Sequence, residues 1–430
     1  MGKRVLVVLV LCVAATSVTG ASDETLRDGF FGISGIIPDF SYFAELRVDC
    51  ATSGFWIGPS ADFVGSNKQA LHTRQMRDFV SYGITPIGTF YLGNVDSSAA
   101  GAAQTIVEYY TSGDGARDVG APVLYWEVGD EQNGIWGTSC PPDEYVRRVA
   151  IVASGIRAAC PECQIVLGGL LDGAAMGDMA LLPYLDRFLE LGGAEWIDVY
   201  AFHYYGLARP SSFAPGDQLY SSAIGIVDGM RRILSAHGAA DASIWVTEMS
   251  TFSGVLGPIE QSESEQAADL VKRYVLLWTL GVEKALWTYL TEPQYEGTGV
   301  GFFDQSGLIY DGVGPADRGA GIKKAGYDAF VHLIDRLSGA TLEDSATQDG
   351  VTRARFSRGG ESITVLWQDP WVRQGTLWVT PAGEVRVENL AGAELARHNS
   401  TFPLEVGIEP VYLVGSPCAV SLAAPLLRSP

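Results

Sequence analysis

The sequence predicts an α/β fold: a (β/α)8 barrel, or TIM barrel, followed by a small C-terminal antiparallel β module of sandwich type. Short apolar strands alternate with longer amphipathic helical patterns from about residue 29 to residue 335. This alternation is typical of a parallel sheet covered by helices. After residue 337 the pattern changes to short alternating segments separated by Gly, Asp and Pro, which indicates antiparallel strands.

The predicted barrel strands are eight short, mostly apolar segments. They are FFGISG (30–35), LRVDCATS (46–53), ITPIGTFYL (84–92), PVLYWEVG (122–129), QIVLGG (164–169), IDVYAFHYY (197–205), SIWVTEM (243–249) and KALWTYL (284–290). Between them lie helical patterns, one of which starts with Ser262 and Glu265 in the spacing of a capping box. Eight strand and helix units close into a barrel, whose catalytic groups sit at the C-terminal strand ends.

The chain divides into four predicted segments. Residues 1–20 have a basic start at Lys3 and Arg4, an apolar middle and small residues at the end, the layout of a secretory signal peptide. The barrel takes residues 21–337, the β-rich module residues 338–415 and a tail residues 416–430. Because no later stretch has the roughly 18 apolar residues of a membrane span, we expect a secreted or periplasmic protein without membrane insertion. The oligomeric state stays open.

The charge balance narrows the class of partner. The formal net charge is −21, and it becomes −23 when Lys3 and Arg4 leave with the signal segment. Such a surface repels phosphate backbones and anionic membranes, so nucleic acid is not an expected partner and neutral substrates fit best. Solubility or salt tolerance alone would also account for the acidity.

Five cysteines follow the signal segment, and we expect them to be structural. CPEC at residues 160–163 has the spacing of a metal knuckle or redox pair, but no second such pair is present. Export favours disulfides, and the odd count leaves one thiol unpaired, either Cys418 or Cys50. No metal or cofactor is predicted, because the sequence has no HExxH motif, close His pair, GxSxG motif or phosphate-binding Gly loop.

Two strands end in carboxylates. The fourth runs PVLYWEVG into Asp130 and Glu131, and the seventh ends at Glu248. Two carboxyl groups on opposite sides of one barrel mouth are what cleavage of a glycosidic bond requires: one protonates the leaving oxygen, and the other attacks or activates water. Glu127 shares the parity of Glu131 and is expected deeper in the barrel, where a buried carboxylate needs a partner.

Aromatic residues and a histidine accompany these carboxylates. His203 and Tyr205 are two positions apart on the sixth strand, so both are expected to face inward. Trp287 and Tyr289 have the same spacing on the eighth strand. Aromatic faces stack on sugar rings, which favours a carbohydrate cleft, although ordinary barrel packing is the alternative for each. Other aromatic residues near strand ends are Tyr91, Trp126 and Trp136.

The segments YWEVGDEQNG, YAFHYYG, IWVTEMS and ALWTYL, in this order, resemble clan A glycoside hydrolases, closest to family 39 and its relatives, in which the fourth strand reads like WEVGNEPN. The resemblance covers roughly residues 30–335. It implies a retaining mechanism with Glu131 as acid/base and Glu248 as nucleophile. It also implies that Tyr205 orients Glu248, that His203 supports the cluster and that Trp287 forms the floor of the sugar subsite.

The sequence departs from the family pattern at Asp130, where the family has an Asn that binds the sugar hydroxyl next to the reacting carbon. An ionised Asp accepts from a hydroxyl but cannot donate. Clan members also carry an Arg on the second strand beside the nucleophile. Arg47 in LRVD is similar to that position, and a shift of the strand end would leave Thr52 there instead.

The sequence thus predicts a retaining glycosidase that cleaves O-glycosidic bonds of a neutral oligo- or polysaccharide. The altered Asp130 keeps an alternative open, a catalytically weak or inactive barrel that acts as a carbohydrate-binding or surface protein. The presence of both Glu131 and Glu248 favours the enzyme.

Overall fold

The computed structural model of the protein describes residues 29–422 except 54–56, 94, 135–138, 173–178, 207–220, 296, 349 and 369–375. The predicted signal peptide and Trp136 lie outside the described residues. Within those residues, no helix combines the length and the apolar content needed to cross a bilayer.

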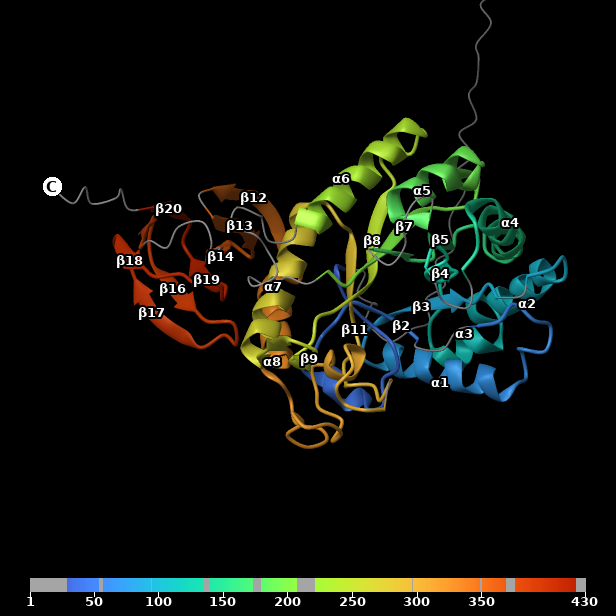
Figure 1. Cartoon of the computed structure of the whole chain (residues 1–430), viewed down its shortest axis with the longest axis horizontal. Coiled ribbons are helices and arrows are strands. Elements are labelled where there is room, and N and C mark those ends of the chain that lie inside the picture. The colour runs from blue at the N-terminus through green and yellow to red at the C-terminus, as the bar shows by residue number, and fades with distance from the viewer. Residues whose placement is uncertain are drawn as a thin grey trace, which may run out of the picture.

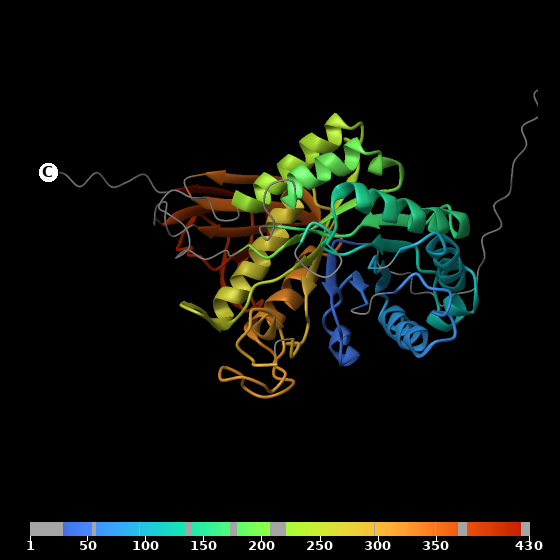
Figure 2. The same cartoon turned by 45° about the vertical axis from the view of Figure 1, so that its right-hand side comes forward.

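Eight parallel strands form the predicted barrel (Figure 1, Figure 2). Their order is β5-β4-β3-β2-β1-β11-β8-β7, and pairing of β5 with β7 closes the ring. Each predicted segment contains one of them: β1 (Phe31–Ser34), β2 (Cys50–Thr52), β3 (Thr85–Phe90), β4 (Tyr125–Val128), β5 (Gln164–Leu167), β7 (Val199–Tyr204), β8 (Ser243–Met249) and β11 (Lys284–Thr288). Three short strands were not predicted: β6 (Leu170–Leu171), β9 (Gly254–Leu256) and β10 (Ile259–Gln261).

Helices surround the barrel on the outside (Figure 1). They are α1 (Asn67–Ser81), α2 (Ala99–Thr111), α3 (Asp114–Val119), α4 (Pro142–Ala159), α5 (Leu181–Glu190), α6 (Ser221–Ala236), α7 (Glu263–Thr279) and α8 (Ala325–Leu337), with 3-10 turns η1 (Phe40–Ala44), η3 (Gly193–Glu195) and η5 (Phe303–Gln305). The predicted capping box starts α7: the Glu265 N–H donates to Ser262 Oγ, and the Ser262 N–H donates to the Glu265 carboxylate. This exchange satisfies two backbone donors that a helix start leaves without partners.

Inward side chains fill the barrel interior on its N-terminal side. A compact apolar group fills it, made of Cys50, Ile87, Val166, Val199, Ala201, Trp245 and Leu286. These residues come from alternating positions of several strands, as expected for a filled barrel interior. Glu127, His203 and Glu248 follow this apolar group along β4, β7 and β8, at the C-terminal end of the barrel.

The C-terminal module has two antiparallel sheets, as predicted. One has the order β12-β13-β14-β19-β16-β17 and the other β18-β15-β20. Their strands are β12 (Thr341–Gln348), β13 (Val351–Arg358), β14 (Glu361–Gln368), β15 (Leu377–Pro381), β16 (Val385–Glu388), β17 (Glu394–His398), β18 (Phe402–Leu404), β19 (Val411–Gly415) and β20 (Cys418–Leu422). The predicted tail at residues 416–430 is wrong in its first part, because β20 pairs with β15 and completes the smaller sheet.

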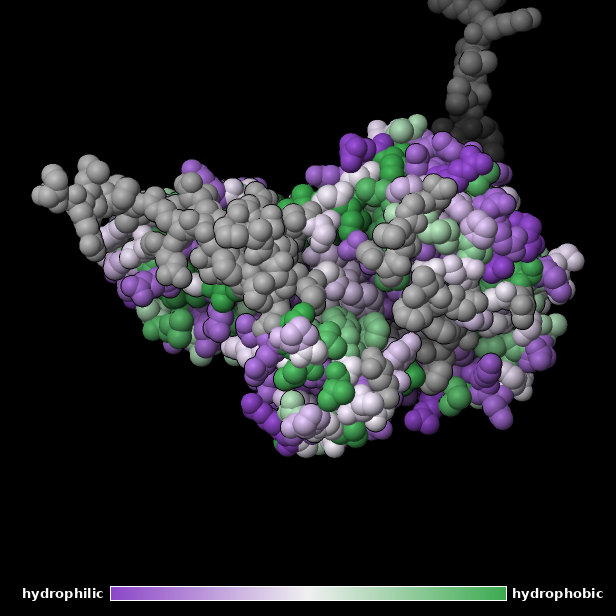
Figure 3. All heavy atoms as spheres, viewed as in Figure 1, coloured by the Kyte–Doolittle hydropathy of each residue, from purple (hydrophilic) through white to green (hydrophobic). Residues whose placement is uncertain are grey.

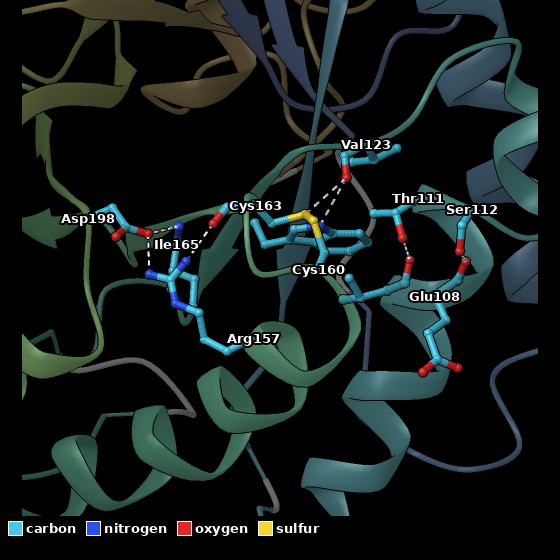
Figure 4. Close-up of a disulfide and its surroundings, with 11 residues drawn as sticks. Glu108, Thr111, Ser112, Val123, Arg157, Cys160, Cys163, Ile165 and Asp198 are labelled. Atoms are coloured by element: carbon cyan, nitrogen blue, oxygen red, sulfur yellow. Dashed lines mark hydrogen bonds and ion pairs between the residues drawn. A yellow bond between two sulfur atoms is a disulfide. The ribbon is translucent and has the colours of Figure 1, made fainter. Parts of the chain in front are cut away.

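The CPEC segment forms a disulfide between Cys160 and Cys163, directly after α4 (Figure 4). Arg157 donates to the Cys163 carbonyl at 2.6 Å and pairs with Asp198 at 2.5 Å, which ties this turn to the chain before β7. The pair is structural, as expected. The expectation of one unpaired thiol is wrong, since three further cysteines of the described chain are buried and form no disulfide: Cys50, Cys140 and Cys418.

Candidate active site

A cavity of about 710 Å³ opens at the C-terminal end of the barrel. Its floor includes Thr89, Glu127, Asp130 and Glu248 from the strand ends, and its walls come from the loops that follow β1 and β11. Ile36 and Tyr295 line it while being 49% and 65% exposed. Apolar surface gathers over the part of the molecule where the loops after β8 and β11 lie (Figure 3). A concave, largely apolar site with a few polar groups is typical of ligand binding.

The chain reverses sharply after β4. Gly129 has a φ of 97° and Glu131 a φ of 46°, both in the left-handed region, and the Glu131 N–H donates to the Gly169 carbonyl at 3.1 Å. A non-glycine residue in this conformation costs about 1 kcal/mol or more, and such strain is concentrated at functional sites. The reversal brings Asp130 and Glu131 to the cavity end of the barrel.

His203 lies at the centre of the carboxylates. The pairing of β7 with β8 shifts just before it: Phe202 is opposite Val246 and His203 is opposite Glu248, so β8 has one extra residue there, Thr247. The Nδ1 of His203 is 2.8 Å from Glu131 Oε1 and 3.7 Å from Glu248 Oε2, and its Nε2 is 4.0 Å from Asp130 Oδ1. Burial alone would lower the pKa of His203, but the three carboxylates outweigh it and raise that pKa to about 10. His203 is therefore an imidazolium at neutral pH.

Glu248 is held by Tyr205. The Tyr205 hydroxyl donates a short hydrogen bond to Glu248 Oε2 and lies 3.2 Å from Thr288 Oγ1. Burial at the cavity floor raises the pKa of Glu248, the Glu131 charge raises it further, and His203 and Tyr205 oppose both. Burial also raises the pKa of Asp130 well above its ordinary value, and the Glu248 charge adds to this. The Glu248 side chain still has 31% of its surface exposed.

Glu127 occupies the inward position below this group, as expected. The Thr89 hydroxyl donates to its Oε2 at 3.4 Å, and the Gly169 N–H donates to its Oε1 at 3.2 Å. Burial raises the pKa of Glu127 to about 7, against the opposing effect of His203. Sequence reasoning missed Gly169: a Cβ there would lie 2.1 Å from the His203 ring. The glycine lets the chain after β5 pack flat against the imidazole.

The predicted sugar-binding roles of Trp126 and Trp287 are wrong. Both side chains are fully buried on the outer side of the barrel wall. Trp126 stacks on Phe90 with ring centroids 5.2 Å apart, and Trp287 Nε1 donates to the Ser306 carbonyl at 3.3 Å. Each is adjacent to an inward residue, and successive strand side chains point to opposite faces. Both therefore pack toward the helices.

Tyr289 does line the cavity, because its backbone leaves the strand alternation. It has a φ of 68°, and its N–H donates to the Ser34 carbonyl at 3.0 Å. Gly35, with a φ of 96°, makes room for its ring, since a Cβ there would lie 2.7 Å from Tyr289 Cδ1. The aromatic wall at this point is thus a tyrosine.

Arg47 does not reach the site. It is exposed and precedes β2, at the end of the strand opposite the cavity. The strand begins only at Cys50, so Thr52 takes the position at the cavity and lines it. The cation that approaches Glu248 is His203, at 3.7 Å.

Loop residues complete the cavity, and the sequence patterns did not single them out. Glu292 lines the wall and forms a buried ion pair with Lys324, whose Nζ also donates to Ser253 Oγ at 2.9 Å. Burial raises the pKa of Glu292 to about 7, and Lys324 opposes this shift. Other lining residues from loops are Asp39, Tyr42, Tyr295, Tyr310 and Asp311. Acids and tyrosines in loops have no spacing that distinguishes them from solvated surface residues.

In the part of the chain that the structure describes, two groups of three side chains have ligand atoms within 4.8 Å of one another, close enough to hold a metal ion: Asp130 with His203 and Glu248, and Glu292 with Asp311 and Asp317. A protonated His203 has no lone pair to offer a metal. Lys324 already occupies Glu292. In each group a cation other than a metal lies near a carboxylate: His203 near Glu248 in the first and Lys324 against Glu292 in the second.

No family model and no curated protein matches the sequence. Solved structures do match. A family 39 glycoside hydrolase from Bacteroides cellulosilyticus has a TM-score of 0.68 at 18% identity, covering 92% of this chain and 82% of that one. A glucosidase from Croceicoccus marinus has a TM-score of 0.64 at 15% identity, covering 93% and 98%.

A family 30 endoxylanase from Clostridium papyrosolvens has a TM-score of 0.59 at 13% identity, covering 92% of this chain and 97% of that one. At such identities the likeness establishes the fold and leaves the activity to the site. The chain has the fold of clan A glycoside hydrolases, a closed (β/α)8 barrel followed by a β module.

Proposed function

We propose that the protein is a retaining glycoside hydrolase acting on a carbohydrate without negative charge, with Glu131 as acid/base and Glu248 as nucleophile. One observation carries the proposal: carboxylates from the ends of β4 and β8 meet at His203 at the base of the cavity, which Glu248 lines. The solved structures with the same fold are named as glycoside hydrolases, which supports the same reaction class.

The spacing of the two carboxylates supports retention. Glu131 Oε1 and Glu248 Oε2 lie 2.8 Å and 3.7 Å from the same His203 nitrogen. These two oxygens are therefore at most about 6.5 Å apart, whereas inverting enzymes need about 6.5–9.5 Å for an intervening water and retaining ones about 5–5.5 Å. Direct attack by Glu248 fits this spacing better than attack by a water between the two groups.

The mechanism assigns a task to each group. Glu131 protonates the leaving oxygen while a Glu248 oxygen attacks the anomeric carbon, so the glycosidic bond breaks and a glycosyl ester forms. Glu131 then removes a proton from water, which attacks the same carbon and releases Glu248. The Tyr205 hydrogen bond fixes the attacking carboxylate, and the His203 imidazolium favours its ionised form.

The test is hydrolysis of a panel of aryl β-glycosides and polysaccharides by the mature protein, beside Glu131→Gln and Glu248→Gln. Glu195→Gln, an exposed carboxylate outside the cavity, is the matched control. We expect losses of about 10³-fold or more in both site variants, none in the control, and an anomeric product of unchanged configuration by NMR. Inverted product, or full activity in Glu248→Gln, contradicts the proposal. Sugar binding without hydrolysis in the wild type would instead favour a carbohydrate-binding barrel.

A further inference from the structure

A chain of three hydroxyl groups leads from β1 across β11 to Glu248. Ser34 Oγ donates to Thr288 Oγ1 at 3.2 Å, and Thr288 Oγ1 lies 3.2 Å from the Tyr205 hydroxyl. The Tyr205 hydroxyl donates to Glu248 Oε2. We propose, resting on the proposed function, that Thr288 is a positioning residue for the nucleophile: its hydroxyl commits the single proton of Tyr205 to Glu248.

The register of the barrel places Thr288 in this hydroxyl chain. Trp287 packs toward the helices, so the next residue, Thr288, has the inward position at the end of β11. It is the partner of Ser34 in the parallel pairing of β1 with β11, and the two residues are only 1% and 2% exposed. Glu248 lines the cavity, whereas Thr288 and Ser34 are not among the described lining residues. Thr288 therefore acts on the nucleophile from behind the cavity wall, through Tyr205.

The number of protons fixes the direction of the hydroxyl chain. A hydroxyl has one proton to donate and two lone pairs that accept, and burying a hydroxyl without a hydrogen bond is unfavourable. Tyr205 gives its proton to Glu248, so the Tyr205 oxygen must accept from Thr288. The Thr288 oxygen in turn accepts from Ser34. All three protons thus point toward Glu248, which is the direction that an ionised carboxylate requires.

The hydroxyl chain favours the ionised form of Glu248. Burial raises the pKa of Tyr205 well above its ordinary value, the Glu248 charge raises it further, and the Thr288 hydrogen bond acts in the opposite direction. Tyr205 therefore keeps its proton, and Thr288 makes it a stronger donor, because hydrogen bonds in a chain polarise one another. Burial also raises the pKa of Glu248, and the Tyr205 hydrogen bond opposes this shift. Loss of the Thr288 hydroxyl should leave Glu248 protonated to a higher pH.

The test is titration of Glu248 by ¹³C NMR in protein labelled at the side-chain carboxyl carbon of Glu. The Glu248 signal is identified by its absence in Glu248→Gln. Thr288→Val keeps the shape of the side chain and removes the hydroxyl. We expect a higher pKa of Glu248 in Thr288→Val than in the wild type, and a return toward the wild-type pKa in Thr288→Ser.

Thr73→Val is the matched control. Thr73 Oγ1 of α1 lies 3.1 Å from the hydroxyl of Tyr110 in α2, so the same change removes the same kind of contact on helices outside the barrel. It should leave the pKa of Glu248 and the activity unchanged. The variants of the hydroxyl chain also leave in place the other titratable groups that interact with Glu248. These are His203, Glu131, Asp130, Glu127 and Tyr289.

A double-mutant cycle shows whether Thr288 acts through Tyr205. Tyr205→Phe should raise the pKa of Glu248 more than Thr288→Val does, and Thr288→Val added to Tyr205→Phe should raise it no further. In hydrolysis of an aryl glycoside, Thr288→Val should lower kcat/KM about three- to tenfold and move the acid limb to higher pH. Both effects should be absent when Tyr205 is already Phe.

Ser34→Ala shortens the hydroxyl chain at its far end and is the second variant. It should raise the pKa of Glu248 less than Thr288→Val does. An unchanged pKa of Glu248 in folded Thr288→Val, or in Ser34→Ala should Thr288→Val not fold, would overturn the inference. Equal effects of Thr288→Val with Tyr and with Phe at position 205 would also overturn it, since Thr288 would then act by another route.

These outcomes are separate from the test of the proposed function. If the wild type hydrolyses no glycoside, the proposed function fails, and the titration, which needs no substrate, still decides the role of Thr288. Hydrolysis that depends on Glu131 and Glu248, with Thr288→Val indistinguishable from the wild type in kcat/KM or in the titration, keeps the hydrolase and overturns the inference.

Discussion

At the N-terminal end of the barrel interior, the buried cation Lys284 lies over the rings of Trp245 at 5.3 Å and Tyr125 at 5.6 Å and donates to the Gly29 carbonyl at 3.1 Å. At the C-terminal end, His203 lies among carboxylates beneath an open cavity. The same strands build both ends. The backbone of the barrel is therefore the same at both ends, and the inward side chains at each end determine whether that end is a packed core or a reactive site.

Among substitutions outside the carboxylate pair, the largest effect is expected from Gly169→Ala, which changes only the C-terminal end of the barrel interior. The new Cβ would lie 2.1 Å from Cδ2 and Nε2 of His203, so the imidazole or the chain at residue 169 must shift, which disturbs the contact between His203 and Glu131. We expect kcat/KM to fall about 10²-fold, because small misplacements of a site have such effects.

Gly225→Ala is the control for this change. It lies in α6, where a Cβ meets nothing within 4 Å, and it should leave activity unchanged and stabilise the helix by up to about 1 kcal/mol. Full activity in Gly169→Ala would show that the contact between this chain segment and His203 is dispensable.

A smaller effect is expected at Arg273 in α7, which is fully buried. Its guanidinium donates to the Tyr204 carbonyl at 3.1 Å and to the Gly206 carbonyl, the carbonyls of the residues on either side of Tyr205. A Lys ammonium cannot form this pair of hydrogen bonds with the planar geometry of a guanidinium. Arg273→Lys should lower kcat about tenfold with little change in KM, and lower the free energy of unfolding by about 1–3 kcal/mol.

Arg231 gives the matched control, because it also binds two backbone carbonyls, those of Ala242 and Gly281, at 2.5 and 3.0 Å. Both precede barrel strands, at the N-terminal end. Arg231→Lys should cost stability but spare kcat. Equal losses of kcat in the two variants would argue that Arg273 acts only through stability.

The pH profile sharpens the comparison further. Burial and the Glu131 charge raise the pKa of Glu248, so the nucleophile keeps its proton to a higher pH than an ordinary Glu at about 4.3. Activity should fall as pH drops through this raised value, and the acid limb of kcat/KM should lie above the ordinary range.

His203→Gln should move that limb still higher, because His203 lowers the pKa of Glu248. The measurement is kcat/KM against pH on variants whose thermal unfolding shows that they are folded. An acid limb that stays in place in His203→Gln would mean that the imidazolium does not control the nucleophile.

The smallest effect on activity is expected at the N-terminal end. Lys284→Met removes a buried charge but keeps the length of the side chain, and replacing buried ions by apolar groups often changes stability little. We expect kcat to be unchanged and the free energy of unfolding to change by about 2 kcal/mol or less. A loss of activity here would show that the two ends of the interior are coupled.

The strands and the carboxylate positions could be predicted from the sequence. Strands of a parallel barrel are buried on both faces and read as apolar runs, and Asp130, Glu131 and Glu248 stand where such runs stop. The alternation of side chains along a strand also excludes Trp126 from the cavity, because its neighbour Glu127 is expected to face inward and Trp126 must then face outward.

Backbone conformation and strand boundaries could not be predicted. Tyr289 faces the cavity only because of its left-handed φ, a backbone conformation that the residue type does not predict. The prediction for Arg47 is wrong because β2 starts at Cys50, later than its apolar pattern suggests. The preceding residue, Asp49, uses its carboxylate to accept the Phe31 N–H at 2.9 Å. The role of Gly169 depends on a ring from a different strand, which no local pattern reveals.

The contact between the barrel and the β module bears on how far this protein can be shortened. The Trp278 ring of α7 meets Phe356 of β13 at 5.3 Å, and Arg336 of α8 binds Glu388 of β16 at 2.9 and 3.0 Å. A chain cut after residue 337 would remove the Phe356 contact of Trp278 and the Glu388 partner of Arg336. Both residues lie on helices that border the barrel, and α7 also carries Arg273. The module therefore supports α7 and α8 and is part of the folded unit. A chimera with the β module of a related protein would also need the matching residues on the surfaces of α7 and α8.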